Sequence, residues 1–180
     1  MTFDLGVHGG QRLLARQITP EDTDALLDFA QRSTAEDLRL RFFSRIRPVH
    51  GPLVERLTHI DPETAIALVA VDPASEAGCK EILGVVRLNH EKGAATGELA
   101  VMVRSDLKHR GIGHELITLI LKLAAERGIT RVVGDVLAEN RAMLRLVRDL
   151  GGRPEARGPE PGIVRVAFET AGLRGSGSTP

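Results

Sequence analysis

The sequence contains no tyrosine and no tryptophan, and five phenylalanines are its only aromatic residues. Nucleic-acid modules that stack bases on rings, and aromatic cages for cations, need more aromatic side chains than this. Basic and acidic residues number 24 each, so the formal net charge is zero, whereas a duplex-DNA binder depends on an excess of lysine and arginine. We therefore expect no nucleic-acid partner and no chemistry that needs a tyrosine hydroxyl.

The sequence has one cysteine, Cys79, and six histidines. A single cysteine excludes an intrachain disulfide and a multi-thiolate metal site, and its polar surroundings indicate an unreactive loop thiol. The histidines lack the His-Glu-x-x-His spacing, so we expect no metal. Residues 1–10 have no apolar core of a signal peptide, and no apolar run approaches the roughly 20 residues of a membrane-spanning helix. These absences predict a cytoplasmic protein with no membrane partner.

What is present is the apolar periodicity of an α+β protein. We expect one domain at 11–170, between flexible ends at 1–10 and 171–180. Strands are expected at 12–18, 65–71, 81–89, 97–104, 130–137 and 163–169. Helices are expected from Thr19 as N-cap, from 33 or 34, and at 52–60, 111–127 and 140–150. An antiparallel meander that runs into a β-α-β crossover implies an α/β (α+β) fold, in which a mixed, mostly antiparallel sheet has helices on both faces.

The strongest functional signal is the glycine-bearing loop that opens the helix at 111–127. The first N–H groups of a helix have no carbonyl partner and suit an anion, and Gly111 and Gly113 allow a close approach. The third glycine of a dinucleotide fingerprint is replaced by Leu116, and no Lys-Ser/Thr pair follows Gly113 as in a P-loop. The loop therefore predicts a pyrophosphate site of another kind, surrounded by four basic residues: Lys108, His109, Arg110 and His114.

The order of strand, basic turn, Gly-x-Gly loop and helix resembles the acetyl-CoA-binding motif of the GNAT superfamily. Most members have Gln or Arg where this chain has Lys108. Residues 36–44, 98–108 and 138–143 also resemble the acetyltransferase domain of bacterial Pat-type protein lysine acetyltransferases, and the resemblance covers about residues 12–170. It implies the GNAT fold with splayed central strands, acetyl-CoA as co-substrate, and direct transfer to an amine, namely a protein lysine, with an acyl-CoA synthetase as a candidate acceptor protein.

The resemblance also implies which residues bind and react. Backbone groups of Val101, Met102 and Val103 would hold the pantetheine arm and polarise the thioester carbonyl. A lysine amine, with a pKa near 10.4, arrives protonated and needs a general base, for which the candidate is Glu98. The remaining cofactor-binding candidates are Lys108, His109, Arg110, Gly111, Ile112, Gly113 and His114 in the loop, and Asn140 at the start of the last helix.

Several alternatives stay open from the sequence. Glu98 also fits an edge-strand glutamate that faces water, and Asn140 fits a helix cap alone. The basic end of the helix near 33–42, with Arg39, Arg41, Arg45 and Arg47, marks either an acidic partner or a solvated face. Many GNAT enzymes place a tyrosine general acid seven residues after this asparagine, where this chain has Val147; a thiolate can leave with a proton from water instead. The acceptor is a protein lysine or a small amine, a non-catalytic CoA-sensing module is the other alternative, and the chain is a monomer or a homodimer.

Overall fold

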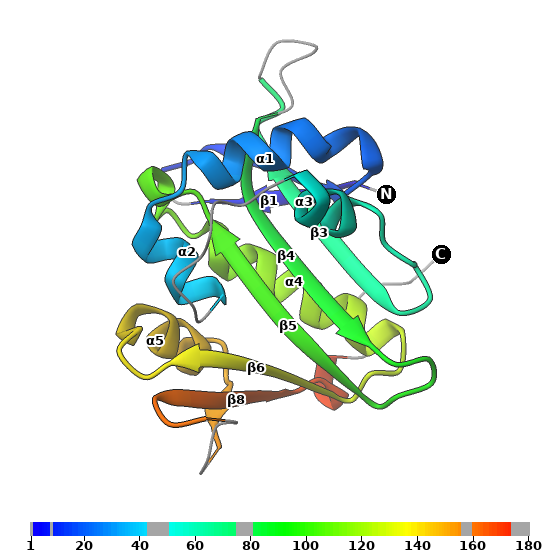
Figure 1. Cartoon of the computed structure of the whole chain (residues 1–180). Coiled ribbons are helices and arrows are strands. Elements are labelled where there is room, and N and C mark those ends of the chain that lie inside the picture. The colour runs from blue at the N-terminus through cyan, green and yellow to red at the C-terminus, as the bar shows by residue number, and fades with distance from the viewer. Residues whose placement is uncertain (1, 8, 43–50, 75–80, 156–159, 174–180) are drawn as a thin grey trace.

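The computed structural model describes residues 2–7, 9–42, 51–74, 81–155 and 160–173, which form one mixed sheet with helices on both faces (Figure 1). The strands are β1 Thr2–Gly6, β2 Arg12–Gln17, β3 Ala65–Val71, β4 Ile82–His90, β5 Thr96–Val103, β6 Arg131–Leu137, β7 Arg153–Pro154 and β8 Ile163–Glu169. The helices are α1 Thr23–Gln31, α2 Ala35–Phe42, α3 Gly51–Thr58, α4 Ile112–Glu126 and α5 Arg141–Asp149. Short 3-10 turns occur at η1 Pro20–Asp22, η2 Ser105–Leu107 and η3 Ala171–Leu173.

The strand order across the sheet is β1-β2-β3-β4-β5-β6-β8-β7, and among the described strands only β5 and β6 pair in parallel. Their pairing runs from Thr96 opposite Arg131 to Glu98 opposite Val133 and stops there. Both strands continue past this point, and β5 stays paired with β4 as far as Val103. The central strands therefore splay apart beyond Glu98, and the predicted mixed, mostly antiparallel GNAT sheet is confirmed.

Two apolar layers hold the helices on the sheet. In Figure 1, α1 and α3 lie in front of the strands and α4 behind them. The face of α4 predicted to be apolar is buried against the sheet, through Leu116, Ile117, Ile120, Leu121 and Ala124. The opposite layer joins α1 and α3 to the strands through Ile18, Leu26, Phe29, Val54, Ala67, Val69 and Ile82. Both faces of β3, beside the central strands, are therefore covered by apolar layers.

The first helical segment begins where the sequence predicts. Thr19 and Asp22 form a capping box around η1, in which the Thr19 N–H donates to Asp22 Oδ2 at 2.9 Å. Asp22 is completely buried, and Arg16 donates two hydrogen bonds to its carboxylate, both at 2.7 Å. The start of the α1 segment is therefore fixed to β2 by an ion pair as well as by its cap.

Three regions differ from expectation or lie outside the described residues. Residues 1–10 are expected to be a loose end, but 2–6 form β1, whose residues pair with β2 from Thr2–Arg16 to Gly6–Arg12. A two-residue strand, β7, adds to β8 at the other edge. Of the predicted C-terminal tail, η3 is described, and 174–180 lie outside the described residues, as do Cys79, Arg45 and Arg47.

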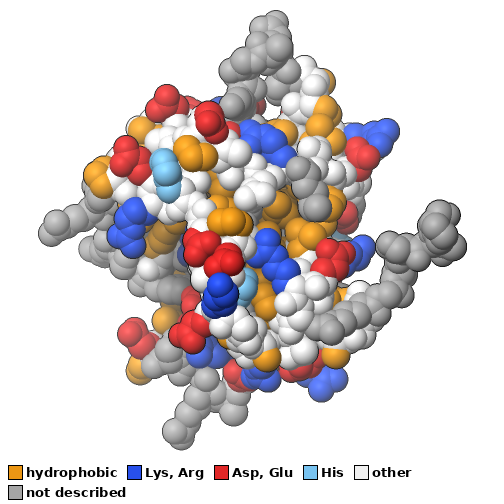
Figure 2. Space-filling model, turned by 90° about the vertical axis from the view of Figure 1, so that its right-hand side faces the viewer, with side chains coloured by type: hydrophobic (Ala, Val, Ile, Leu, Met, Phe, Trp, Pro, Cys, Tyr) orange, Lys and Arg blue, Asp and Glu red, His pale blue; other side chains and the backbone are white. Residues whose placement is uncertain are grey.

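Charge is spread over the surface rather than segregated by sign on the side shown in Figure 2. There, acidic and basic side chains alternate with hydrophobic ones, as a net charge of zero allows. Within the described ranges, no helix is both long and apolar enough to cross a bilayer.

Candidate active site

A cleft of about 810 Å³ lies where β5 and β6 separate. Its walls come from the splayed parts of both strands, the start of α4, one side of α5 and the inner side of α2. Eleven of the predicted site residues line it: Glu98, Val101, Met102, Val103, Lys108, His109, Gly111, Ile112, Gly113, His114 and Asn140. The exposed Arg110 is not among the residues that line it. The fold thus brings the strand, the loop and the helix start together around one cavity.

The backbone of β5 faces alternately toward β4 and toward the cleft, because alternate residues of a strand bond to opposite neighbours. The Arg104 N–H donates to Leu83 O of β4 at 3.0 Å, while Ala95 O on the β6 side accepts from the N–H groups of Thr130 and Arg131. Odd-numbered residues of this strand therefore direct their backbone groups toward β6, where the partner strand has moved away.

This alternation separates the three predicted pantetheine ligands. Val101 and Val103 present their backbone N–H and C=O groups to the gap, whereas the backbone of Met102 faces β4, where Met102 is opposite Val85. The side chain of Met102 packs instead in the layer beneath α1 and α3. Two residues, Val101 and Val103, thus have main-chain groups that an extended ligand can bond as it would bond a neighbouring strand.

Glu98 lies at the point where the two central strands part. Its backbone is inside the sheet, opposite Asn89 of β4 and Val133 of β6, so Glu98 is not on an edge strand. Its side chain is exposed and lines the cleft, on the same sheet face as Ala100 and Met102. The carboxylate is therefore open to solvent and to an incoming acceptor, at the apex of the splayed strands.

The loop before α4 has the backbone shape of an anion site. His109 and Gly111 both take left-handed conformations, with φ of 64° and 88°, and at Gly111 the lack of a Cβ makes this turn possible without strain. The first hydrogen bond within the helix is donated by the Glu115 N–H to Gly111 O, at 3.0 Å. The amides of Ile112, Gly113 and His114 thus have no acceptor within the helix and point out of its positive end.

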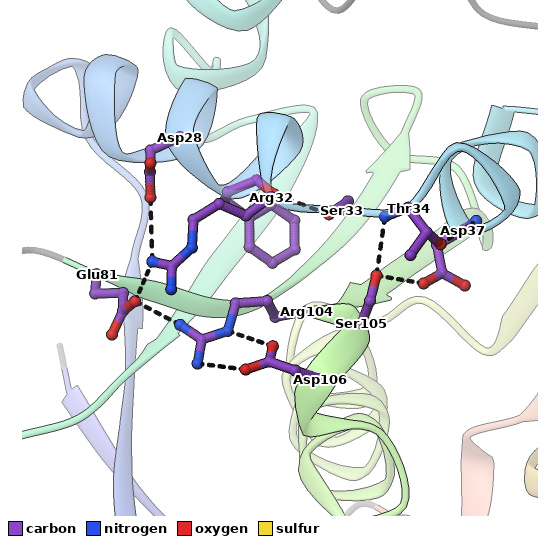
Figure 3. A network of polar contacts seen from close by, with 10 residues as sticks. Asp28, Arg32, Ser33, Thr34, Asp37, Glu81, Arg104, Ser105 and Asp106 are labelled. Carbon is purple, nitrogen blue, oxygen red and sulfur yellow. Dashed lines mark hydrogen bonds and ion pairs between the residues drawn. The ribbon is translucent and has the colours of Figure 1, made fainter.

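Lys108 has a different partner from the one expected. Its ammonium pairs with the buried carboxylate of Asp37 in α2, which also accepts a hydrogen bond from Ser105. Ser105 Oγ in turn accepts from the Thr34 N–H at 3.0 Å (Figure 3). Burial raises the pKa of Asp37, but the hydrogen bonds from Lys108 and Ser105 outweigh it and keep that pKa below its usual value. This pairing ties the pyrophosphate loop to α2.

A second set of ion pairs holds the end of β5 in place. Arg104 is buried and donates to both carboxylate oxygens of Asp106, at 2.6 and 3.0 Å. Arg104 and Arg32 also share Glu81, which precedes β4, and Figure 3 shows these groups beside Ser105. The turn that leads from β5 into the loop is thereby fixed to α1 and β4.

The start of α5 completes the cleft wall. Asn140 Oδ1 accepts the Met143 N–H at 3.1 Å, so the predicted helix cap is present, and the residue also lines the cleft. Val147 of α5 is at the position where many GNAT enzymes have tyrosine. It is buried, beside Gly152 and Phe168. No residue that lines the described cleft is a serine, threonine or cysteine.

Sequence reasoning missed three charged residues on the Glu98 side of the sheet, Asp135, Arg165 and Arg87, and noted Arg41 only as part of the basic end of a helix. Asp135 of β6 accepts two hydrogen bonds from Arg165 of β8, at 2.8 and 2.9 Å, and this pairing raises the pKa of Arg165. Arg41 of α2 also lines the cleft. Burial and the nearby charge of Arg87 lower the pKa of Arg41 to about 10 against an opposing effect of Glu98, and burial lowers the pKa of Arg87. Arg41 lies in the segment 36–44 noted above, where the alternative of a solvated face is wrong for this side chain.

Comparison with known proteins identifies the fold and its chemistry. Residues 12–153 match the family described as "Acetyltransferase (GNAT) domain". The chain belongs to the GNAT acetyltransferase family. This GNAT protein is 26% identical over 142 residues to an acetyltransferase of Pseudomonas aeruginosa, which covers 79% of this chain and 75% of that protein. Members of the family use acetyl-CoA, and the chain is an acetyltransferase.

Solved structures give the same result. The GNAT domain of S. lividans PAT is 27% identical, covers 93% of this chain and 96% of that chain, and superimposes with a TM-score of 0.84. Arabidopsis thaliana NAA60, solved in complex with acetyl-CoA, is 17% identical over 87% of this chain and 98% of that chain, with a TM-score of 0.67. The second likeness concerns the fold alone, whereas the first extends to sequence over nearly the whole of both chains.

Proposed function

We propose that this GNAT acetyltransferase transfers the acetyl group of acetyl-CoA directly to the side-chain amine of a protein lysine, with an acyl-CoA synthetase as the first candidate acceptor. The observation that carries the proposal is the similarity to the GNAT domain of S. lividans PAT, which spans 93% of this chain at 27% identity. The segments at 36–44, 98–108 and 138–143, which resemble Pat-type lysine acetyltransferases, all contribute residues to the cleft.

In this proposal the cleft holds acetyl-CoA by main-chain groups. The pantetheine arm lies beside β5 and bonds Val101 and Val103, as an added strand would. The pyrophosphate rests on the amides of Ile112, Gly113 and His114 at the positive end of α4. An N–H of β5 that points into the gap polarises the thioester carbonyl and stabilises the negative oxygen of the tetrahedral intermediate.

Glu98 acts as the general base. The lysine ammonium must lose a proton before it can attack, and the exposed carboxylate accepts that proton directly or through one water. The amine then attacks the carbonyl carbon, the new C–N bond forms, and the C–S bond breaks. Because the described lining offers no Ser, Thr or Cys nucleophile, the acetyl group passes in one transfer without an acyl-enzyme.

The departing thiolate takes its proton from water in this scheme. The chain has no tyrosine to supply it, and Val147 occupies the position where other members carry one. A thiol has a pKa near 8.5, so the thiolate is a good enough leaving group to depart without a positioned general acid. The Glu98 side of the cleft carries Asp135, whose carboxylate is paired with Arg165 of β8, and it therefore offers charges of both signs to a protein surface.

The test is an acetylation assay with purified proteins. The chain is incubated with acetyl-CoA and either an acyl-CoA synthetase or a panel of free polyamines and amino acids, and products are identified by mass spectrometry. We expect the synthetase to gain one acetyl group on a lysine, at a rate well above that of a reaction without the chain. Turnover of free amines with no change in the synthetase would show a small-molecule enzyme instead, and binding of acetyl-CoA without any turnover would show a CoA-binding module.

A further inference from the structure

A second cavity adjoins the cleft on the Glu98 face of the sheet. It has a volume of about 60 Å³, several times the roughly 10–15 Å³ that one water needs. Helices α1, α2 and α3 line one side of it, and strands β4 and β5 form its floor. It shares Arg41, Ala100 and Met102 with the cleft, so the two spaces meet at β5.

The cavity is apolar except for two arginines. Arg41 comes from α2, and Arg87 comes from β4, directly beside Ala100 in the register of the sheet. Arg87 donates a hydrogen bond to Leu57 O, and the guanidinium of Arg41 lies 4.9 Å from the centre of the Phe42 ring. Within the described part of the chain, neither arginine forms an ion pair with a carboxylate. Two half-buried cations thus face one apolar space, and the exposed Glu98, whose charge acts on Arg41, is not among the residues that line this space.

Such an arrangement is unfavourable unless an anion completes it. Like charges near each other in an apolar setting destabilise one another, and the partial burial of both guanidinium groups has a desolvation cost. A carboxylate placed between them would gain charge-assisted hydrogen bonds from two guanidinium groups, the geometry that arginine favours. The cavity therefore fits a small ligand with a short hydrocarbon part and a terminal carboxylate.

The position of the cavity favours the acyl donor as the source of this carboxylate. It lies beside Ala100, next to Val101, whose backbone faces the place proposed for the thioester. Ala100 lines both the cleft and the cavity and has the smallest side chain on this face of β5. An acyl chain longer than acetyl would start from the cleft that shares this wall with the cavity.

We infer that the chain also accepts acyl-CoA donors whose short acyl chain ends in a carboxylate, such as succinyl-CoA, and that Arg41 and Arg87 bind this carboxylate. The inference rests on the proposed function, since the same site performs the transfer. The lysine amine attacks the succinyl thioester carbonyl, the C–N bond forms and the C–S bond breaks. The amine proton passes to Glu98, and CoA leaves as thiolate and takes a proton from water. The lysine then carries a negative group in place of its positive one.

Calorimetric binding of CoA esters, without any acceptor, tests the inference. Succinyl-CoA is compared with butyryl-CoA, whose acyl group has the same number of carbons but carries no charge. We expect the wild-type chain to bind succinyl-CoA about tenfold more tightly or better, the effect of hydrogen bonds to a charged group. Arg41→Met should remove most of this preference, and so should Arg87→Met. Arg56→Met, at an exposed position of α3, is the matched control and should keep it.

Each contrary result has a distinct meaning. Equal affinity for the two esters in the wild-type chain, or a preference that survives in both arginine variants, would overturn the inference. The affinity of each variant for acetyl-CoA shows whether it is folded. A parallel arm uses acetyl-CoA with lysine peptides that carry either Glu or Gln beside the lysine. If Arg41→Met removed a preference for the acidic peptide and left the esters unaffected, the carboxylate would belong to the acceptor and the acyl assignment would be wrong.

The proposed function and the inference fail separately. Acetylation of a synthetase lysine with no preference for succinyl-CoA would leave the proposed function in place and remove the second donor. A preference for succinyl-CoA in binding, with no acetylation of any protein, would keep the arginine site and remove the lysine acceptor.

Discussion

Glu98→Gln is expected to lower kcat/KM for lysine acetylation by about 10²- to 10⁴-fold at pH 7, the usual contribution of a general base. The amide keeps the shape of the side chain but accepts no proton from the lysine ammonium. Because Glu98 lies on the acceptor side of β5 and its side chain is exposed, the substitution leaves the pyrophosphate loop untouched. Initial rates with saturating acetyl-CoA measure the loss, and direct titration measures the affinity for acetyl-CoA, which should stay within about threefold.

Glu126→Gln is the matched control for this experiment. Glu126 is exposed at the far end of α4, and it is not among the residues that line the cleft. Its substitution should change the rate by less than about twofold, as is usual for surface positions. A Glu98→Gln enzyme as active as the Glu126→Gln enzyme would remove Glu98 as the base and would leave water to take the proton.

Asp22→Ala is expected to lower the free energy of unfolding by about 3 kcal/mol at pH 7, because it leaves Arg16 without its partner. The Asp22 side chain is 0% exposed and accepts four hydrogen bonds: two from Arg16 at 2.7 Å, one from the Thr19 N–H at 2.9 Å and one from the Thr19 hydroxyl at 3.3 Å. The matched control is Asp28→Ala, which removes an ion pair to Arg32 from a side chain that is 58% exposed. It should cost less than about 1 kcal/mol. Urea denaturation measures both.

The same aspartate makes stability depend on pH in a definite direction. Burial raises the pKa of Asp22, but the hydrogen bonds from Arg16 and Thr19 outweigh it, and the net pKa lies below the usual value. The stabilisation is therefore present above the unfolded-state pKa of about 3.9 and is lost as the pH falls through the lower folded-state pKa. The difference between the wild-type chain and Asp22→Ala should narrow below about pH 4. A constant difference down to pH 2, or a loss no larger than that of Asp28→Ala, would contradict this account.

Local patterns were enough to predict most of the fold. The apolar run at Ala65–Val71 and the amphipathic helix between Gly111 and Arg127 follow directly from the periods of a buried strand and a half-buried helix. β1 escaped prediction because its five residues depend on pairing with β2, and an edge strand so short carries little periodicity of its own.

The candidate site was predictable where it depends on neighbours in the sequence and not where it depends on distant ones. The Gly-x-Gly loop and the Asn140 cap are signals of a few residues. The pairing of Lys108 with Asp37 joins positions 71 apart, and Arg41 and Arg87 line one cavity only because α2 packs on β5, the neighbour of β4. The backbone direction of Met102 is fixed by the register between β4 and β5, which no local pattern contains.

A crystal structure of the chain with bound CoA tests the central claim most directly. We expect the pantetheine arm between β5 and β6, hydrogen-bonded to the main chain of Val101 and Val103, with the pyrophosphate on the amides of Ile112, Gly113 and His114. The thiol should lie on the side of the cleft that Glu98 lines, within reach of that carboxylate directly or through one water. CoA bound away from the gap between these strands, or a thiol that Glu98 cannot reach in this way, would contradict it.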